Sequence, residues 1–135
     1  MGLAERRAAQ TYRTDEFPEW KRKIDQAACF EVPVEVAWDE LAVDGYAGDY
    51  SAFFTKVYFR PLAEALGAIT IDDLGKDALK AGLEKIVVKN SGQYYSNSGF
   101  TFAGGVLTVD HRAESNVEYY DERAKQLQQL LESGL

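Results

Sequence analysis

The chain has 135 residues, of which 46% are hydrophobic and 27% are charged, a composition typical of one globular domain and not of a disordered segment. A single cysteine, Cys29, excludes an internal disulfide and the cysteine-rich zinc sites, and its apolar neighbours predict a buried, unreactive thiol. The net charge is −7, and residues 24–135 hold eighteen acidic against nine basic side chains, so nucleic acid is not an expected partner. With no secretory signal and no apolar stretch of membrane-spanning length, we expect a cytoplasmic protein without a membrane partner.

The opening segment lacks a clean apolar stripe, so we expect residues 1–13 to form a flexible N-terminal arm and residues 14–135 to form a single domain. The first firm helix is predicted over residues 18–29, because apolar side chains recur there at helical spacing and Pro18 suits a first turn. A strict alternation follows, with Val32, Val34, Val36 and Trp38 on one face, which indicates a half-buried strand. Pro33 cannot donate to a neighbouring strand, so this strand is expected at a sheet edge.

A loop is expected over residues 39–48 and helix over residues 49–69, with Pro61 kinking or dividing that helix. The next helix is predicted to begin near Thr70 with Asp73 in a capping box, and to bury Leu74, Ala78 and Leu79.

The apolar period then changes to two, which predicts a strand over residues 85–89 and a hairpin across Gly104-Gly105. That hairpin pairs Phe100 with Val109 and Phe102 with Leu107. A last helix of about 19 residues is predicted to start at a capping box of Ser115 and Glu118. The predicted fold is therefore α+β in the order α-β-α-α-β-β-β-α, with a four-stranded, largely antiparallel sheet and helices packed on one face.

Few reactive side chains are available for catalysis. The only histidine is His111, and its neighbour Asp110 must point to the opposite face of the strand, so the two cannot form a dyad with each other. We predict no catalytic, metal-binding or cofactor-binding residues and no cofactor, and the question of enzymatic activity stays open with a leaning against it. If the chain does hold a pocket, we expect it beside His111 and Asp110, with the loop 93–99 as a lid and tyrosines as walls.

An interaction surface is the favoured alternative to a catalytic site. Two tyrosine doublets, 94–95 and 119–120, are expected to leave rings exposed, and the sheet face opposite the helices is expected to carry mixed charged and β-branched residues. The predicted surface consists of Tyr94, Tyr95, Tyr119, Lys85, Lys89, Thr101 and Thr108.

These features favour a small, acidic, non-catalytic module, regulatory or antidote-like, that binds a protein, and a basic protein would suit its charge. The alternative is a small-molecule-binding domain or a metal-independent enzyme with its site near His111. A homodimer formed through the sheet is a third interpretation.

Overall fold

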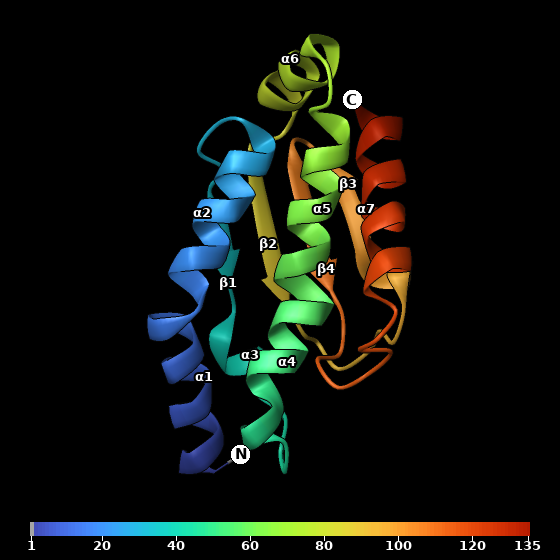
Figure 1. Ribbon diagram of the computed structural model, residues 1–135. Coiled ribbons are helices and arrows are strands. Elements are labelled where there is room, and N and C mark those ends of the chain that lie inside the picture. The colour runs from blue at the N-terminus through green and yellow to red at the C-terminus, as the bar shows by residue number, and fades with distance from the viewer. Residues whose placement is uncertain (1) are drawn as a thin grey trace.

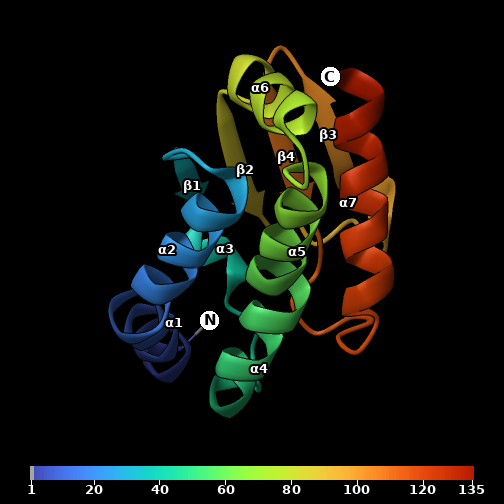
Figure 2. The same ribbon diagram turned by 45° about the horizontal axis from the view of Figure 1, so that its top comes forward.

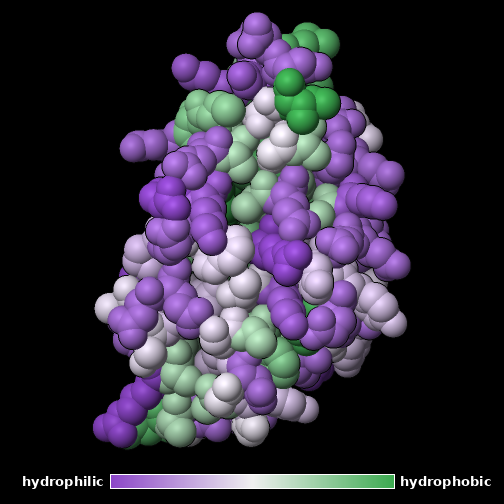
Figure 3. All heavy atoms as spheres, in the orientation of Figure 1, coloured by the Kyte–Doolittle hydropathy of each residue, from purple (hydrophilic) through white to green (hydrophobic). Residues whose placement is uncertain are grey.

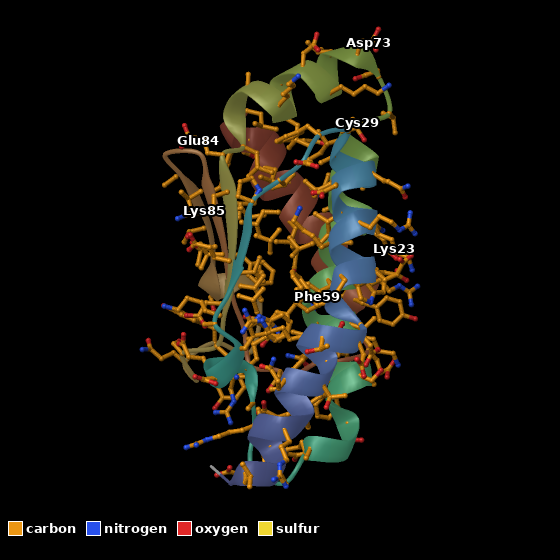
Figure 4. All side chains as sticks on the ribbon, turned by 90° about the vertical axis from the view of Figure 1, so that its left-hand side faces the viewer. Lys23, Cys29, Phe59, Asp73, Glu84 and Lys85 are labelled. Atoms are coloured by element: carbon orange, nitrogen blue, oxygen red, sulfur yellow. The ribbon has the colours of Figure 1, made fainter. Side chains whose placement is uncertain are left out.

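A four-stranded sheet forms one layer of the protein and three long helices form the other (Figure 1). The computed structural model describes residues 2–135. In the view turned by 90°, Phe59 lies between the two layers, whereas Lys85 lies on the side of the sheet that faces away from the helices (Figure 4). The strands are β1 (Val34–Val36), β2 (Lys85–Lys89), β3 (Phe100–Ala103) and β4 (Val106–Asp110).

The helical layer consists of α2 (Phe17–Ala28), α5 (Arg60–Ile69) and α7 (Tyr120–Gly134), which lie side by side over one face of the sheet (Figure 1). Figure 2 shows α6 at the same end of the molecule as the C-terminal end of α7, with α1 and α4 toward the other end. The shorter or peripheral helices are α1 (Leu3–Asp15), α3 (Trp38–Leu41), α4 (Tyr50–Phe54) and α6 (Asp73–Gly82), and short 3-10 turns span Ala47–Asp49 and Asn97–Gly99.

The predicted class is confirmed, but the sheet is mixed where a largely antiparallel one was expected. Its order is β1-β2-β4-β3, and both the β1–β2 and β2–β4 pairs are parallel. The physical reason is the long helical crossover between β1 and β2, since a connection through several helices returns the chain in the same direction. Only β3 pairs antiparallel, with β4. The carboxyl ends of three strands therefore meet at one edge of the sheet.

The hairpin register and the position of the first strand agree with the predictions from the sequence. Phe100 pairs with Val109 and Phe102 with Leu107, and Gly104 and Gly105 have φ angles of 58° and 79°, which a two-residue turn of this hand requires. Strand β1 lies at the sheet edge, where Pro33 causes no loss of a ladder hydrogen bond.

The first residues do not form the arm that their sequence suggested. Helix α1 runs from Leu3 to Asp15 and packs through Ala9 and Tyr12, of which Tyr12 is only 1% exposed. Its hydroxyl lies 2.8 Å from that of Thr55, and its ring packs against Phe54 and Phe59. One large aromatic side chain therefore anchors a helix that has no continuous apolar stripe.

Two helix starts differ from the expected capping boxes. Asp72, and not Thr70, caps α6 by accepting a hydrogen bond from the Gly75 amide at 2.7 Å, while the Thr70 hydroxyl donates to the carbonyl of Ala27. Helix α7 begins at Tyr120, and no side chain caps it. Ser115 and Glu118 both precede this start, and Glu118 instead pairs with Lys56 at 2.8 Å.

Cys29 is exposed, in contrast to the buried thiol that its neighbours predicted. It follows the last residue of α2 in a left-handed conformation, with φ of 67°. Its side chain points outward because it occupies the position at which the chain leaves the helix.

The helical segment before Pro61 divides as expected, and Pro61 lies in the first turn of its second α-helix. A π-helical segment, Thr55–Phe59, joins α4 to α5 and places Pro61 in the first turn of α5. Proline has no N–H to donate to the preceding turn, so the carbonyls of Lys56 and Val57 need another donor. Arg123 of α7 supplies it, with Nε 3.1 Å from the Val57 oxygen and Nη2 3.5 Å from the Lys56 oxygen.

Candidate binding sites

A hollow of about 210 Å³ opens beside the carboxyl end of β4. Open sheets with parallel strands tend to bind ligands at this edge, beyond the carboxyl ends of the strands. Loop residues 95–97, the first residue after β4 and the first two turns of α7 contribute to it. The lining residues are Tyr95, Ser96, Asn97, His111, Asn116, Tyr119, Glu122, Arg123 and Gln126.

His111 forms the floor of this hollow, because it lines the hollow although it is only 1% exposed. Its Nδ1 lies 2.7 Å from the carbonyl oxygen of Arg112, which can only accept, so Nδ1 carries a proton. Nε2 is buried and has no hydrogen-bond partner among the described residues. Burial lowers the pKa of His111, so the ring is neutral at pH 7 and Nε2 is an unused acceptor.

Asp110 does not share this site with His111. It is 7% exposed, and its Oδ1 accepts a hydrogen bond from the backbone amide of Ser91 at 2.9 Å. The carboxylate therefore holds the start of the loop 90–99, as expected for two neighbours on a strand that point in opposite directions.

The loop that was expected to act as a lid is fastened to the segment after β4. The Arg112 amide donates to the Tyr94 carbonyl at 2.9 Å, and the Asn116 side chain donates to the Tyr95 carbonyl at 2.5 Å. Arg112 also contacts the Tyr95 ring, with its guanidinium carbon 5.0 Å from the ring centre. These contacts make the loop one wall of the hollow.

Arg123 is the second unusual group of the hollow, and no pattern in the sequence indicates its role. It is 3% exposed, yet no carboxylate of the described residues lies within ion-pair distance. Besides Lys56 and Val57, its Nη2 donates to the carbonyl of Asn116 at 2.9 Å. Desolvation lowers the pKa of Arg123 to about 10, so the group stays cationic at neutral pH without a counter-charge.

The predicted interaction residues separate into two groups. Tyr95 and Tyr119 are 54% and 57% exposed and both line the His111 hollow, whereas Tyr94 is half-buried beneath Gly99. The other four lie on the open face of the sheet, where Lys85 pairs with Glu35 at 3.2 Å. These four are Lys85, Lys89, Thr101 and Thr108.

A second site lies at the far end of α7, and sequence reasoning missed it. Ile71 and Leu74 are 81% and 80% exposed, although Leu74 was expected to be buried. Figure 3 shows strongly hydrophobic atoms at the top of the molecule, where Figure 1 places α6. The helix-spacing pattern failed at Leu74 because the first turn of α6 faces outward, whereas Leu79 is fully buried and Ala78 is half-buried.

The exposed side chains border a groove of about 450 Å³ between α5, α6 and the end of α7, which we call the α6–α7 groove. Asp72 and Glu132 supply two carboxylates to it, and no described residue that lines it is cationic. Gly75 permits the close packing of α6 against α5, since a Cβ there would lie 1.7 Å from the Ile69 carbonyl oxygen. The lining residues are Ala68, Ile69, Ile71, Asp72, Leu74, Gly75, Ala78, Gln128, Glu132 and Leu135.

Comparisons with known proteins yield no match: no family model, no curated protein and no solved structure is similar to this chain. Between residues 2 and 135, no helix has the length and apolar character needed to cross a membrane. Over the same residues, no group of three or more histidine, cysteine, aspartate or glutamate side chains is placed to hold a metal ion.

Proposed function

We propose that this protein is a small non-catalytic module that binds a protein segment carrying both apolar and basic side chains, and that the α6–α7 groove is where that segment docks. The observation that carries this proposal is the exposure of Ile71, just before α6, and of Leu74, in its first turn, each about four-fifths accessible. Large apolar side chains that gather on a surface mark interaction sites more often than single scattered ones do.

The two exposed side chains can contribute substantially to the free energy of binding. Burying one isoleucine or leucine side chain fully is worth roughly 1.5–3 kcal/mol, so the pair supplies about 3–6 kcal/mol before the cost of association. Because Ile71 lies just before α6, Leu74 lies in its first turn and both line the groove, a partner that inserts its own apolar residues there covers both at once.

Charge determines the kind of partner. Asp72 and Glu132 lie in the groove, and the whole chain carries a charge of −7. A basic segment gains attraction to both carboxylates and to the domain as a whole, which mainly raises its rate of association. An amphipathic helix with leucines on one face and lysines beside them meets both requirements. A regulatory or antidote-like role would use such a surface to cover a basic target.

A binding assay with matched peptides tests the proposal. One helical peptide of about 15 residues carries leucines and lysines, and a second carries glutamates in place of the lysines. We expect fluorescence anisotropy to show binding of the basic peptide only, with an affinity that falls as salt rises. The Ile71→Ser/Leu74→Ser variant should weaken binding by about a hundredfold or more, since it loses about 1.5 kcal/mol or more per side chain.

The control variant is Tyr95→Ser/Tyr119→Ser, which removes the exposed tyrosines at the other end of α7. We expect it to bind the basic peptide as the unaltered protein does. Equal binding of both peptides, or binding that is lost in the tyrosine variant and retained in the Ile71/Leu74 variant, would contradict the proposal. Concentration-dependent self-association that disappears in the Ile71/Leu74 variant would instead assign the groove to a second copy of the chain.

A further inference from the structure

The His111 hollow contains three groups whose electrostatic or hydrogen-bonding capacity is unused by the protein. The first is Arg123, a cation that is 3% exposed and has no carboxylate partner among the described residues. Its Nε and Nη2 donate to carbonyl oxygens, but Nη1 makes no hydrogen bond within the described part of the chain. A buried charge without a counter-charge is costly, and a bound anion would reduce that cost.

The second group is the N-terminus of α7. Tyr119, Glu122 and Arg123 all line the hollow, so the first turn of this 15-residue helix borders it. No side chain caps the helix, which leaves its first backbone N–H groups without a side-chain acceptor. The positive end of the helix dipole adds to the attraction that Arg123 exerts on an anion.

The third group is the buried Nε2 of His111, and it requires a hydrogen-bond donor. Nε2 has no partner among the described residues, and the Arg112 carbonyl fixes the tautomer in which it accepts. This orphaned acceptor is independent of the helix terminus and points to a ligand with an O–H group. The same hollow of about 210 Å³ is lined by Tyr95 and Tyr119, which are exposed.

From these groups we infer that the hollow binds a small hydroxy-carboxylate, with its carboxylate at Arg123 and the α7 N-terminus and its hydroxyl donating to His111 Nε2. The hollow is smaller than the roughly 300–1,000 Å³ of drug-sized pockets, so the ligand has only a few carbon atoms. Glu122 is exposed at the edge of the hollow and opposes the anion. The α7 residues of this site precede those of the α6–α7 groove, with Arg123 about 14 Å from Glu132 along the helix axis, and the inference does not depend on the protein-binding proposal.

Lactate and propionate are suitable probes, because they differ mainly in the hydroxyl group. We would titrate each into the ¹⁵N-labelled protein at constant ionic strength, up to about 50 mM, a range that covers the millimolar affinity of so small a ligand. We expect lactate to shift the amides of the first turn of α7 and the imidazole signals of His111. Propionate should bind about three- to tenfold more weakly, because one hydrogen bond is lost.

Two variants test separately how the protein binds the hydroxyl and the carboxylate of the ligand. His111→Phe keeps a ring in the floor and should remove the preference for lactate over propionate without abolishing propionate binding. Glu122→Gln removes the opposing charge at an exposed position and should tighten both. Since Arg123 also supports the fold, these two variants allow a test without replacing it. No shift at the α7 first turn with either probe would overturn the inference, as would equal affinities for lactate and propionate or an effect that sodium chloride alone reproduces.

Discussion

Replacement of Arg123 by methionine tests how α7 holds the long helix that contains Pro61. Methionine is similar in length but donates no hydrogen bonds, so the carbonyls of Lys56 and Val57 lose the donor that replaces the missing proline N–H. Each buried carbonyl left without a partner costs about 1–3 kcal/mol of stability. Removal of an uncompensated buried charge is itself stabilising and offsets part of that loss. We therefore expect a net loss of about 2–4 kcal/mol in the free energy of unfolding.

A double-mutant cycle with Pro61→Ala makes this reasoning specific. Alanine restores a backbone N–H at position 61 that can donate to one of the same two carbonyls. In the Pro61→Ala protein, Arg123→Met should therefore cost about 1–2 kcal/mol less than it does in the unaltered protein. Urea unfolding, with the slope of the transition compared between variants, measures all four proteins. Additive effects of the two substitutions would refute the assignment of Arg123 as the substitute donor.

Three further predictions concern the pH dependence and the backbone. Burial lowers the pKa of His111 from its usual 6.5, so the unfolded chain takes up the proton at a higher pH than the folded chain does. The free energy of unfolding should therefore decrease as the pH falls below about 6.5, by at most about 1.4 kcal/mol per pH unit. Gly75→Ala should destabilise the protein by about 1–3 kcal/mol, because its Cβ would collide with the Ile69 carbonyl. Cys29→Gly should stabilise it by about 0.5–1 kcal/mol, because glycine adopts the left-handed conformation there without strain.

Chemical unfolding measures each of these three effects. His111→Gln is the control for the first, and a slope near pH 6 that survives in this variant would exclude His111 as its source. For Gly75→Ala, a stability equal to that of the unaltered protein would show that α6 can move away from α5 freely. A loss of stability in Cys29→Gly would show that the thiol contributes more than its backbone conformation costs.

The parts of the fold that could be predicted were those fixed by neighbours in the sequence. The register across Gly104-Gly105 followed from the requirement for positive φ at the turn, and the edge position of β1 followed from Pro33. Strand direction could not be predicted in the same way. It depends on how the helices between β1 and β2 pack, and no local pattern encodes that.

The candidate sites show the same limit. The sequence could place His111 at the end of a strand and expect tyrosines nearby, because strand periodicity is local. It could not predict that His111 and Arg123 line the same hollow, since this requires α7 to pack beside the segment after β4. Leu74 was misjudged because helical spacing predicts which side chains share a face, and only the tertiary packing decides whether that face is covered.

The proposed function rests on where a basic partner docks, and mapping that contact by ¹⁵N–¹H correlation spectroscopy is the most direct test. The basic amphipathic peptide would be titrated into the labelled protein, with the charge-reversed peptide as control. We predict that shifts concentrate in α6 and in the last two turns of α7, around Ile71, Leu74 and Glu132. Shifts confined to the open sheet face or to the His111 hollow, or no shifts with the basic peptide, would contradict the account.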